Sequence, residues 1–568
     1  MARNKYLLLV SSLGVLGLLM AAIVREHWLR EWRRIQRRAL SAEGPLAVQL
    51  RQIVNPGLGR ADRCVSCHLR SAPGETPLAS ERVLAPHSPL PYDPGEFGCT
   101  ICYGGQGQAT DQADAHGDVP FWPEPMLPVW FSEAGCGTCH SLPGVPQAQA
   151  LAEARLTFER LDCLACHRMD GRGGTLRPDG FGQEGPDLSQ VALKGYDRQW
   201  YPKHLVQARE AAGGAWKTFR EISQEDLRRL QLYLDTRMGA PRLVEGQALF
   251  YSAGCLGCHK VSGVGGDEGP DLSQAGLKDP GRLAFDAPHG APRLVNWLIE
   301  HFRSPSALVE NSQMPAVRLS ERETELLTLY TLSLRRRDLP ASLTPRDRVR
   351  TSWMGEREFA QDGATLYSAF CAGCHGSHGQ GVRSPGMSAF PAVAHPDLLA
   401  LVPDEFLRAT VERGRPGRRM PAWGQIAGGL RAQEIQTVVA YLRQLGGVAF
   451  QPDGRPARWV QGNMSEGRRL YAAVCAGCHG DRGQGGEGPA LNNPVLLETA
   501  TDSFLVQTIR RGRRGTGMPA FSQPSPAYRA LDEDEIFSVV AFLRSWQPAA
   551  RPSPVAATAN PGDRRSMP

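Results

Sequence analysis

The chain has 568 residues, of which 41% are hydrophobic, 21% charged and 7% aromatic, and its net charge is +6. This length allows several domains of roughly 100–200 residues, and the balance permits packed cores. The 62 glycines and 44 prolines favour small, loop-rich units. The arginine-rich stretches lie near Met-Pro turns and beside the apolar N-terminal segment and are not the aromatic-interleaved runs that grip nucleic acid, which argues against a nucleic-acid partner.

An uncharged apolar stretch over residues 6–24 is the first element. About 20 apolar residues cross a bilayer as a helix, whereas a signal peptide has roughly 7–15. Trp28 and Trp32 follow it, as expected for residues at a membrane interface. We predict an uncleaved anchor and a basic juxtamembrane helix over 1–43, with a cleaved signal peptide as the alternative.

All 14 cysteines belong to seven Cys-x-x-Cys pairs, and a histidine directly follows six of them. Cys-x-x-Cys-His attaches haem c: the thiols bond the porphyrin and the histidine binds iron. Disulfides need no such histidine, and a zinc site needs four ligands at one centre. The sequence therefore predicts six covalently bound haems c. The expected attachment residues are Cys64, Cys67, Cys136, Cys139, Cys163, Cys166, Cys255, Cys258, Cys371, Cys374, Cys475 and Cys478, and the proximal ligands are His68, His140, His167, His259, His375 and His479.

Residues 44–148 hold three closely spaced pairs and little helical periodicity. We expect an irregular multihaem segment here. His87 and His116 lie between the pairs and are the candidates for the second ligands of His68 and His140, with Met126 as a competitor.

The seventh pair, Cys99 and Cys102, is followed by Tyr103 instead of histidine. Two interpretations stay open. In an oxidising compartment the two thiols can pair or persist as a remnant of a lost haem site. Tyrosine is also a known axial ligand, so a seventh haem is possible.

Residues 149–240 and 241–340 form two similar units that share Gly-Pro-Asp-Leu-Ser-Gln after the haem motif. In the second unit, Met314 opens a Met-Pro turn and is the expected distal ligand of His259. Thioether sulfur is a soft ligand, and it raises the potential of haem iron. A capping box of Ser320 and Glu323 predicts the start of the closing helix.

The first of these units lacks a Met-Pro turn. The offset of 97 residues that aligns His204 with His301 places Lys217 at the position of Met314. Lys217 is the first candidate for the second ligand of His167; Met238, His204 and an open position are the alternatives. A lysine ligand must lose its proton, so such a haem would be pH-sensitive.

Two further units cover residues 355–447 and 458–547. Met420 and Met518 each open a Met-Pro turn before a final amphipathic helix and are the expected distal ligands of His375 and His479. The helices are indicated by apolar residues at i, i+3, i+4 and i+7, beginning at Ile435 in one and at Ile536 in the other. Residues 548–568 are rich in Pro, Ala and Arg and are expected to be disordered.

These units resemble class I cytochrome c domains, over about residues 150–340, 355–447 and 458–547. The last two are similar to the c-domains of haem–copper oxidase cytochrome subunits, through Cys-Ala-Gly-Cys-His-Gly and Met-Pro-Ala followed by an aromatic residue. The resemblance implies a mainly α fold with four tandem helical domains. It also implies a backbone carbonyl that orients each proximal histidine, expected at Pro186, Pro270 and Pro489.

Taken together, these motifs predict a multihaem cytochrome of a bacterial inner membrane, with its haem domains in the periplasm. Six Arg against two Glu in residues 25–38 favour the opposite orientation, but covalent haem attachment outweighs that signal. The expected role is non-catalytic electron transfer in a respiratory or photosynthetic chain. The expected partners are a quinol-oxidising complex, a soluble cytochrome and an oxidase. The alternative is a multihaem redox enzyme, a reductase, sulfur-compound dehydrogenase or peroxidase, with an open haem at His167.

Overall fold

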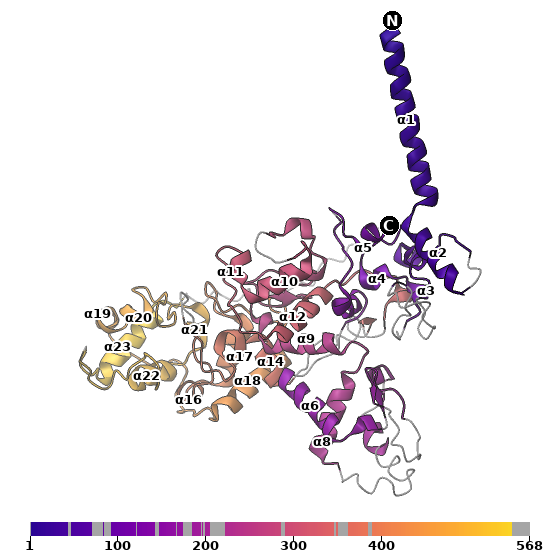
Figure 1. Cartoon of the computed structure of the whole chain (residues 1–568). Coiled ribbons are helices and arrows are strands. Elements are labelled where there is room, and N and C mark those ends of the chain that lie inside the picture. Colours follow the sequence, from indigo (N-terminus) through magenta and orange to yellow (C-terminus); the bar gives the residue numbers. More distant parts are fainter. Residues whose placement is uncertain are drawn as a thin grey trace, which may run out of the picture. The chain divides into compact units, whose positions relative to one another are not determined.

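Helices form most of the regular structure of the computed structural model, as the sequence predicts (Figure 1). The structure describes residues 2–43, 47–70, 83, 92–120, 122–141, 147–165, 167–173, 185–194, 196, 199–204, 222–285, 290–345, 348–349, 362–383, 389–526 and 528–547. It divides into two compact units, Met1–Phe370 and Cys371–Pro568.

The N-terminal helix α1 (Ala2–Trp28) is long and apolar enough to cross a membrane. Its apolar side chains are exposed: Leu8 is 68% and Leu18 73% accessible. A side chain of this kind gains nothing from water, so a bilayer is the environment that suits the helix. In Figure 1 it extends away from the other helices of its unit.

A second helix, α2 (Glu31–Glu43), connects α1 to the first haem motif. Ile35 and Ala39 are buried on one face and pack against Cys67. The buried Gln36 amide donates to the carbonyls of Gln49 and Ser66 at 2.9 and 2.8 Å. The juxtamembrane helix thus packs its inner face on the first haem motif.

The irregular segment after α2 is built from short elements, as expected. They are the antiparallel hairpin of β1 (Ile53–Asn55) and β2 (Arg60–Asp62), α3 (Pro94–Phe97), α4 (Thr100–Tyr103), α5 (Gln112–His116) and the 3-10 helices η1 (Pro56–Leu58), η2 (Cys64–Ser66) and η4 (Val129–Thr138). The helices α4 and η4 pack together, and each carries a Cys-x-x-Cys pair at or near one end.

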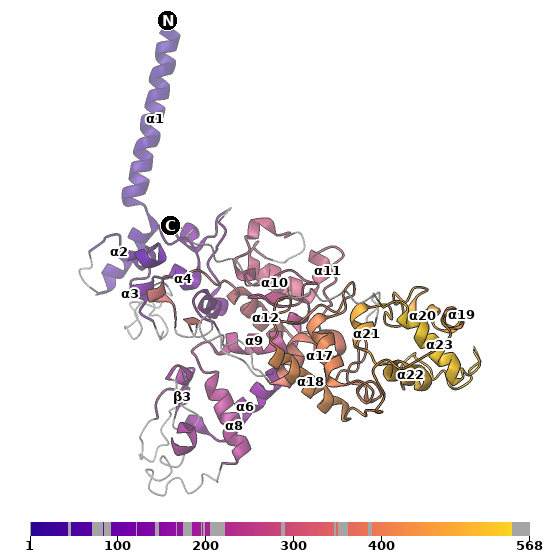
Figure 2. The same ribbon diagram turned by 180° about the vertical axis from the view of Figure 1, so that it is seen from behind.

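The rest of the first unit repeats one plan in which a helix before each haem motif packs on a closing helix. The pairs are α6 (Ala148–Arg160) with α8 (Gln224–Asp235) and α9 (Pro241–Ser252) with α12 (Glu321–Ser333), as Figure 2 shows for the first of them. A short hairpin follows each proximal histidine, β3 (Arg168–Met169) with β4 (Arg172–Gly173) and β5 (Lys260–Val261) with β6 (Val264–Gly265). The remaining elements are η5 (Cys163–Ala165), η6 (Val191–Lys194), η7 (Cys255–Gly257), η8 (Ala275–Leu277), η9 (Pro280–Arg282), α10 (Leu294–Arg303), α11 (Pro305–Leu308), η10 (Ala341–Leu343) and α14 (Gly363–Phe370).

Close approach of the paired helices depends on glycine. A Cβ on Gly246 in α9 would lie 2.4 Å from the carbonyl oxygen of Leu326 in α12. The predicted capping box is confirmed at the start of α12, where Ser320 and Glu323 cap each other's backbone. The start of this helix is therefore where the sequence predicts it, and the close approach at Gly246 is a finding of the structure.

The second unit contains two further copies of these helices, but in the first copy the helix before the haem motif, α14, belongs to the first unit and packs on α9. The first copy has α15 (Ala372–His375), α16 (Pro396–Leu399), α17 (Asp404–Arg413) and α18 (Ala432–Gly446), and the second has α19 (Met464–Val474), α20 (Ala476–His479), α21 (Pro494–Thr499), α22 (Asp502–Arg511) and α23 (Glu533–Arg544). A Cβ on Gly467 in α19 would lie 1.9 Å from the carbonyl oxygen of Ser538 in α23, so here too glycine permits close packing.

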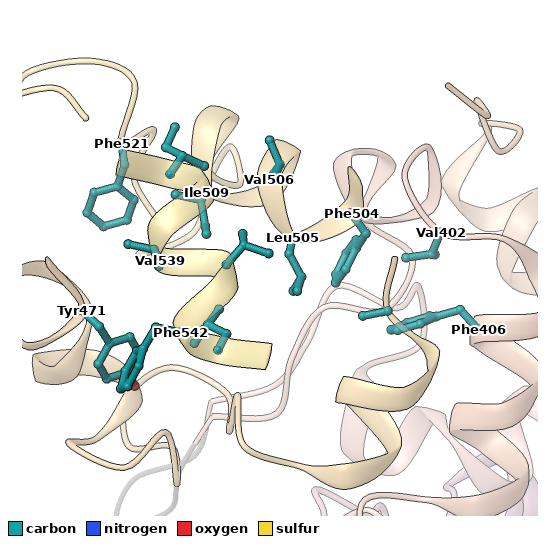
Figure 3. Packing of buried hydrophobic residues seen from close by; sticks show 14 of the residues in the cluster. Val402, Phe406, Tyr471, Phe504, Leu505, Val506, Ile509, Phe521, Val539 and Phe542 are labelled. Atoms are coloured by element: carbon teal, nitrogen blue, oxygen red, sulfur yellow. The ribbon is translucent and has the colours of Figure 1, made fainter. Parts of the chain in front are cut away.

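One apolar core joins the two copies. Its buried side chains come from both, and Phe406 of α17 packs on Phe504 of α22 with ring centroids 5.4 Å apart (Figure 3). The predicted helical faces are buried, since Ile435 and Ile536 are each 1% exposed. Burying one phenylalanine contributes about 1.5–3 kcal/mol, so this contact fixes the two copies against each other.

Candidate haem sites

The six Cys-x-x-Cys-His segments share one backbone hydrogen bond. In each, the histidine N–H donates to the carbonyl of the first cysteine, at 2.8–3.0 Å. This single turn brings two sulfurs and an imidazole together, which is what covalent attachment and proximal ligation of one haem require. Cys166 lies outside the described residues.

Four of the expected proximal histidines are oriented by a proline carbonyl. The Nδ1 atoms of His167, His259, His375 and His479 lie 2.8–2.9 Å from the carbonyl oxygens of Pro186, Pro270, Pro391 and Pro489, respectively. Three of these prolines are the ones that the resemblance implied. Because Nδ1–H donates to the carbonyl, Nε2 is the nitrogen available to iron.

The loop beside these histidines is shaped around the imidazole. A Cβ on Gly269 would lie 2.4 Å from Cε1 of His259, and one on Gly488 would lie 2.8 Å from Cε1 of His479. Only glycine lets the chain pass so close. The residues therefore fit a proximal histidine held rigidly under a haem, which when bound supplies a one-electron couple tuned by its axial ligands.

The Met-Pro turns of the second unit carry a half-buried arginine each. Arg415 and Arg513 donate their backbone N–H to the carbonyls of Met420 and Met518, both at 2.9 Å. Burial lowers the pKa of Arg415 to about 10, and its Nη1 has no hydrogen-bond partner among the described residues. Nη2 of Arg415 donates to the Thr410 hydroxyl at 3.0 Å, so Nη1 is the donor that a carboxylate such as a haem propionate would fit.

In the domain that contains His167, residues 149–240, His204 lies beside this expected proximal histidine. The two ring centroids are 6.2 Å apart. Burial, with a smaller contribution from His167, lowers the pKa of His204. Met238 instead packs against the apolar core of this domain. Lys217, the first candidate from the sequence, lies outside the described residues.

The unit of His259 has a comparable histidine. Burial, reinforced by His259 and Lys278, lowers the pKa of His301 to about 4. The expected distal ligand, Met314, is half-buried, and its backbone N–H lies 3.3 Å from the Ser312 hydroxyl.

The three N-terminal cysteine pairs converge. A hydrogen bond between the Cys64 and Cys99 thiols lowers the pKa of Cys64 and raises that of Cys99. The buried Asp62 carboxylate accepts from the N–H groups of Cys99 and Thr100, at 2.6 and 2.8 Å. Asp62 therefore fixes α4, with the seventh pair, against the first haem motif.

The seventh pair has the backbone of a haem motif without its histidine. The N–H of Tyr103 donates to the carbonyl of Cys99 at 3.1 Å, as the histidine does in the other six segments. Burial raises the pKa of Tyr103 to about 12 and that of Cys102 to about 11. Both interpretations of this pair therefore stay predictions.

The contacts of the other N-terminal candidates do not show which of them is an iron ligand. Tyr92 Oη lies 2.6 Å from Nε2 of His140, so haem at this histidine requires the exposed Tyr92 side chain to move. The backbone carbonyl of His116 accepts from the N–H of Met126 at 2.8 Å, which brings the two competing candidates side by side. His87 lies outside the described residues.

Three residues of these sites are not predicted by the sequence analysis: Pro391, Asp62 and Tyr92. For Pro391 the signal was obscured because Phe390 replaces the glycine of the other Gly-Pro pairs. Asp62 stands two residues before Cys64, but nothing in that spacing reveals that it binds a second motif 37 residues later.

Two family models match this chain. The one described as cbb3-type cytochrome c oxidase subunit III matches residues 358–442 and 462–543, and the one described as cytochrome c matches residues 243–335. All three stretches contain a Cys-x-x-Cys-His segment and a Met-Pro turn.

Two similar proteins are named, like the first family model, as subunits of cbb3-type cytochrome c oxidases. The cbb3-type cytochrome c oxidase subunit FixP of Bradyrhizobium diazoefficiens is 31% identical over 192 residues, which are 32% of this chain and 59% of the relative. The cbb3-type subunit CcoP of Azospirillum sp. is 29% identical, over 32% of this chain and 60% of the relative. The chain thus spans about three-fifths of the length of these relatives.

Another relative is the cytochrome bc1 complex cytochrome c subunit of Corynebacterium diphtheriae, 26% identical over 36% of this chain and 72% of the relative. A solved structure of a reducing HAO-like protein complex from Kuenenia stuttgartiensis covers 33% of this chain and 97% of its own, at 18% identity and a TM-score of 0.24. A TM-score of 0.24 is too low to indicate a shared overall fold. The family matches and the haem-motif geometry lead to one conclusion: the C-terminal part of this chain is made of c-type cytochrome domains, one matched by the general cytochrome c family and two of the cbb3 oxidase subunit III type.

Proposed function

We propose that this chain is a membrane-anchored multihaem cytochrome c that carries electrons through six covalently bound haems, with its haem domains in the periplasm. The observation that carries the proposal is the recurrence of one construction in four domains. Each has a Cys-x-x-Cys-His turn whose histidine Nδ1 is held by a proline carbonyl. The construction presents Nε2 to iron and leaves the redox chemistry to the haem.

The second ligands decide whether such haems carry electrons or bind substrates. Met420, Met518 and Met314 are the proposed distal ligands of His375, His479 and His259. An iron with two protein ligands has no position for a substrate, so electron transfer is the activity that such sites support. His116 and His87 are the proposed second ligands in the N-terminal segment.

A second part of the proposal concerns the electron donor and the electron acceptor of this chain. Relatives of this chain are named as subunits of a cbb3-type oxidase and of a bc1 complex. Both names support transfer from a quinol-oxidising complex or a soluble cytochrome to an oxidase or another high-potential acceptor. Three methionine-ligated haems suit such an acceptor because thioether ligation raises the potential.

The test is a haem count and a carbon monoxide difference spectrum of the reduced, full-length protein. Six haems by pyridine haemochrome and no carbon monoxide binding are the expected result. Carbon monoxide binding to one haem would instead favour a catalytic site. A count of seven would assign a haem to Cys99 and Cys102, and a count below six would contradict the proposed attachment set.

A further inference from the structure

A stack of three aromatic rings stands beside the haem motif of His167. Tyr196 and Trp200 are parallel within 5° with centroids 4.1 Å apart, and Trp200 and His204 are parallel within 6° at 4.6 Å. Residues 200–204 are helical, so Trp200 and His204 lie one turn apart on the same face. The stack fixes the plane and position of the His204 imidazole.

The His204 ring, held in this position, lies close to His167, the expected proximal histidine. The centroids of His167 and His204 are 6.2 Å apart. Two imidazoles that share one metal through ring nitrogens, each about 2 Å from the metal, have centroids roughly 6 Å apart. Since Nδ1 of His167 bonds the Pro186 carbonyl at 2.9 Å, its Nε2 is the atom directed to that shared metal.

The same construction recurs in the next unit. Trp297 and His301 of α10 are parallel within 11° at 4.7 Å, and His301 lies 97 residues after His204. Its buried Nδ1 has no hydrogen-bond partner among the described residues. A tryptophan-supported histidine near the proximal one is therefore part of the repeat. The unit of His167 differs in that it has no Met-Pro turn to compete with it.

We propose that His204 is the second axial ligand of the haem at His167, held in place by Trp200. This inference rests on the proposed attachment of haem at Cys163 and Cys166. It makes that haem bis-histidine, closed to small ligands and lower in potential than the methionine-ligated haems of the chain. Trp200 is a positioning residue, since it reaches the iron only through the His204 ring.

The test uses the full-length, haem-loaded protein in detergent. In His204→Ala, one haem is expected to become high-spin by electron paramagnetic resonance and to bind carbon monoxide when reduced, with the haem count unchanged. In His204→Met, the count is again unchanged, no carbon monoxide binds, and the potential of one haem rises. The matched controls Lys217→Ala and Met238→Ala are expected to give the spectra of the parent.

Two results would overturn the assignment: spectra of His204→Ala that match the parent at a full haem count, or a high-spin haem in Lys217→Ala or Met238→Ala. If His204→Ala loses haem through misfolding, the potential of His204→Met decides, and an unshifted potential rejects the ligand. The underlying attachment is tested separately, because Cys163→Ala with Cys166→Ala should remove one haem. A full count in that variant refutes the proposed function at this site rather than the ligand.

Discussion

His395 and Asn493 occupy equivalent positions in the two C-terminal domains, and each hydrogen-bonds a carbonyl of the other domain. His395 Nε2 lies 2.9 Å from the oxygen of Arg514, and Asn493 Nδ2 donates to the oxygen of Pro416 at 3.2 Å. Both carbonyls stand four residues before a Met-Pro methionine. Each domain therefore holds the loop that carries the other domain's expected distal ligand.

This reciprocal contact predicts that a change in one domain alters the haem of the other. In His395→Ala, the potential of the haem at Met518 should fall by up to about 40 mV, the equivalent of about 1 kcal/mol for one hydrogen bond. Asn493→Ala should act in the same way on the haem at Met420. Spectroelectrochemical titration measures both.

Both residues also cap a helix, so a control must separate capping from the interdomain bond. Asn463→Ala removes the N-cap of α19, where Asn463 accepts from two backbone N–H groups, and should leave both potentials unchanged. His395→Asn introduces the residue of the other repeat and should restore the parent value. Equal shifts in Asn463→Ala and His395→Ala would attribute the effect to capping.

The distal methionines give the most direct prediction. Met420→Ala and Met518→Ala should each lower the potential of one haem, by on the order of 100 mV, because thioether ligation raises the potential. Each variant should also lose part of the methionine–iron charge-transfer absorption. Met464 is an exposed methionine at the start of α19, so Met464→Ala is the matched control. Titration curves that overlay the parent's would remove both ligand assignments.

Arg544 should contribute strongly to the stability of the last domain. Its guanidinium donates to the Ala500 carbonyl at 2.7 Å and pairs with the buried Asp502 at 2.8 Å. Removing one partner of a buried pair costs about 3–5 kcal/mol, because the other charge stays buried. Arg544→Met should therefore speed hydrogen exchange in α23, measured by mass spectrometry.

An exposed arginine provides the comparison. Arg469 pairs with Glu466 at 2.5 Å on the surface of α19, where water screens the two charges and the pair contributes little to stability. Arg469→Met should leave exchange in α23 close to the parent's. Similar protection in Arg544→Met and Arg469→Met would show that the carbonyl contacts of Arg544 are dispensable.

Asp397 should make the interdomain contact acid-sensitive. A hydrogen bond from Arg514 lowers the pKa of Asp397 to about 2, and His395 faces the same carboxylate at 3.7 Å. Because the folded pKa is below the ordinary 3.8, the contact stabilises the fold above about pH 4 and is lost as the pH falls towards 2.

Asp397→Asn tests this dependence. At pH 6 it should slightly lower the urea midpoint for loss of the Met518 charge-transfer band, because the exposed Arg514 side chain leaves the ion pair screened by water. Near pH 2 the parent and the variant should coincide. Glu487 pairs with Arg383 at 3.6 Å, and both side chains are more than two-thirds exposed, so Glu487→Gln should change nothing at either pH.

The sequence by itself determined the cofactor class and the helical fold, and it marked the candidates for the proximal histidines. A covalent haem requires two thiols and a histidine within five residues, and such local chemistry is visible in the order of residues. The same holds for the closing helices, whose apolar period sets the buried face, and for the Ser320–Glu323 cap. The Gly-Pro pairs also predicted three of the four proline carbonyls that accept from Nδ1 of the expected proximal histidines.

Only the tertiary structure decided which distant residues meet. The repeat offset placed Lys217 at the position of Met314, but it could not reveal that Trp200 stacks on His204 or that the His204 ring lies beside His167. The Asp62 bond to α4 and the reciprocal bonds of His395 and Asn493 likewise join residues that are 37 to 119 positions apart. Such contacts form only when distant loops pack against a common core, and a local sequence pattern does not predict which loops will meet.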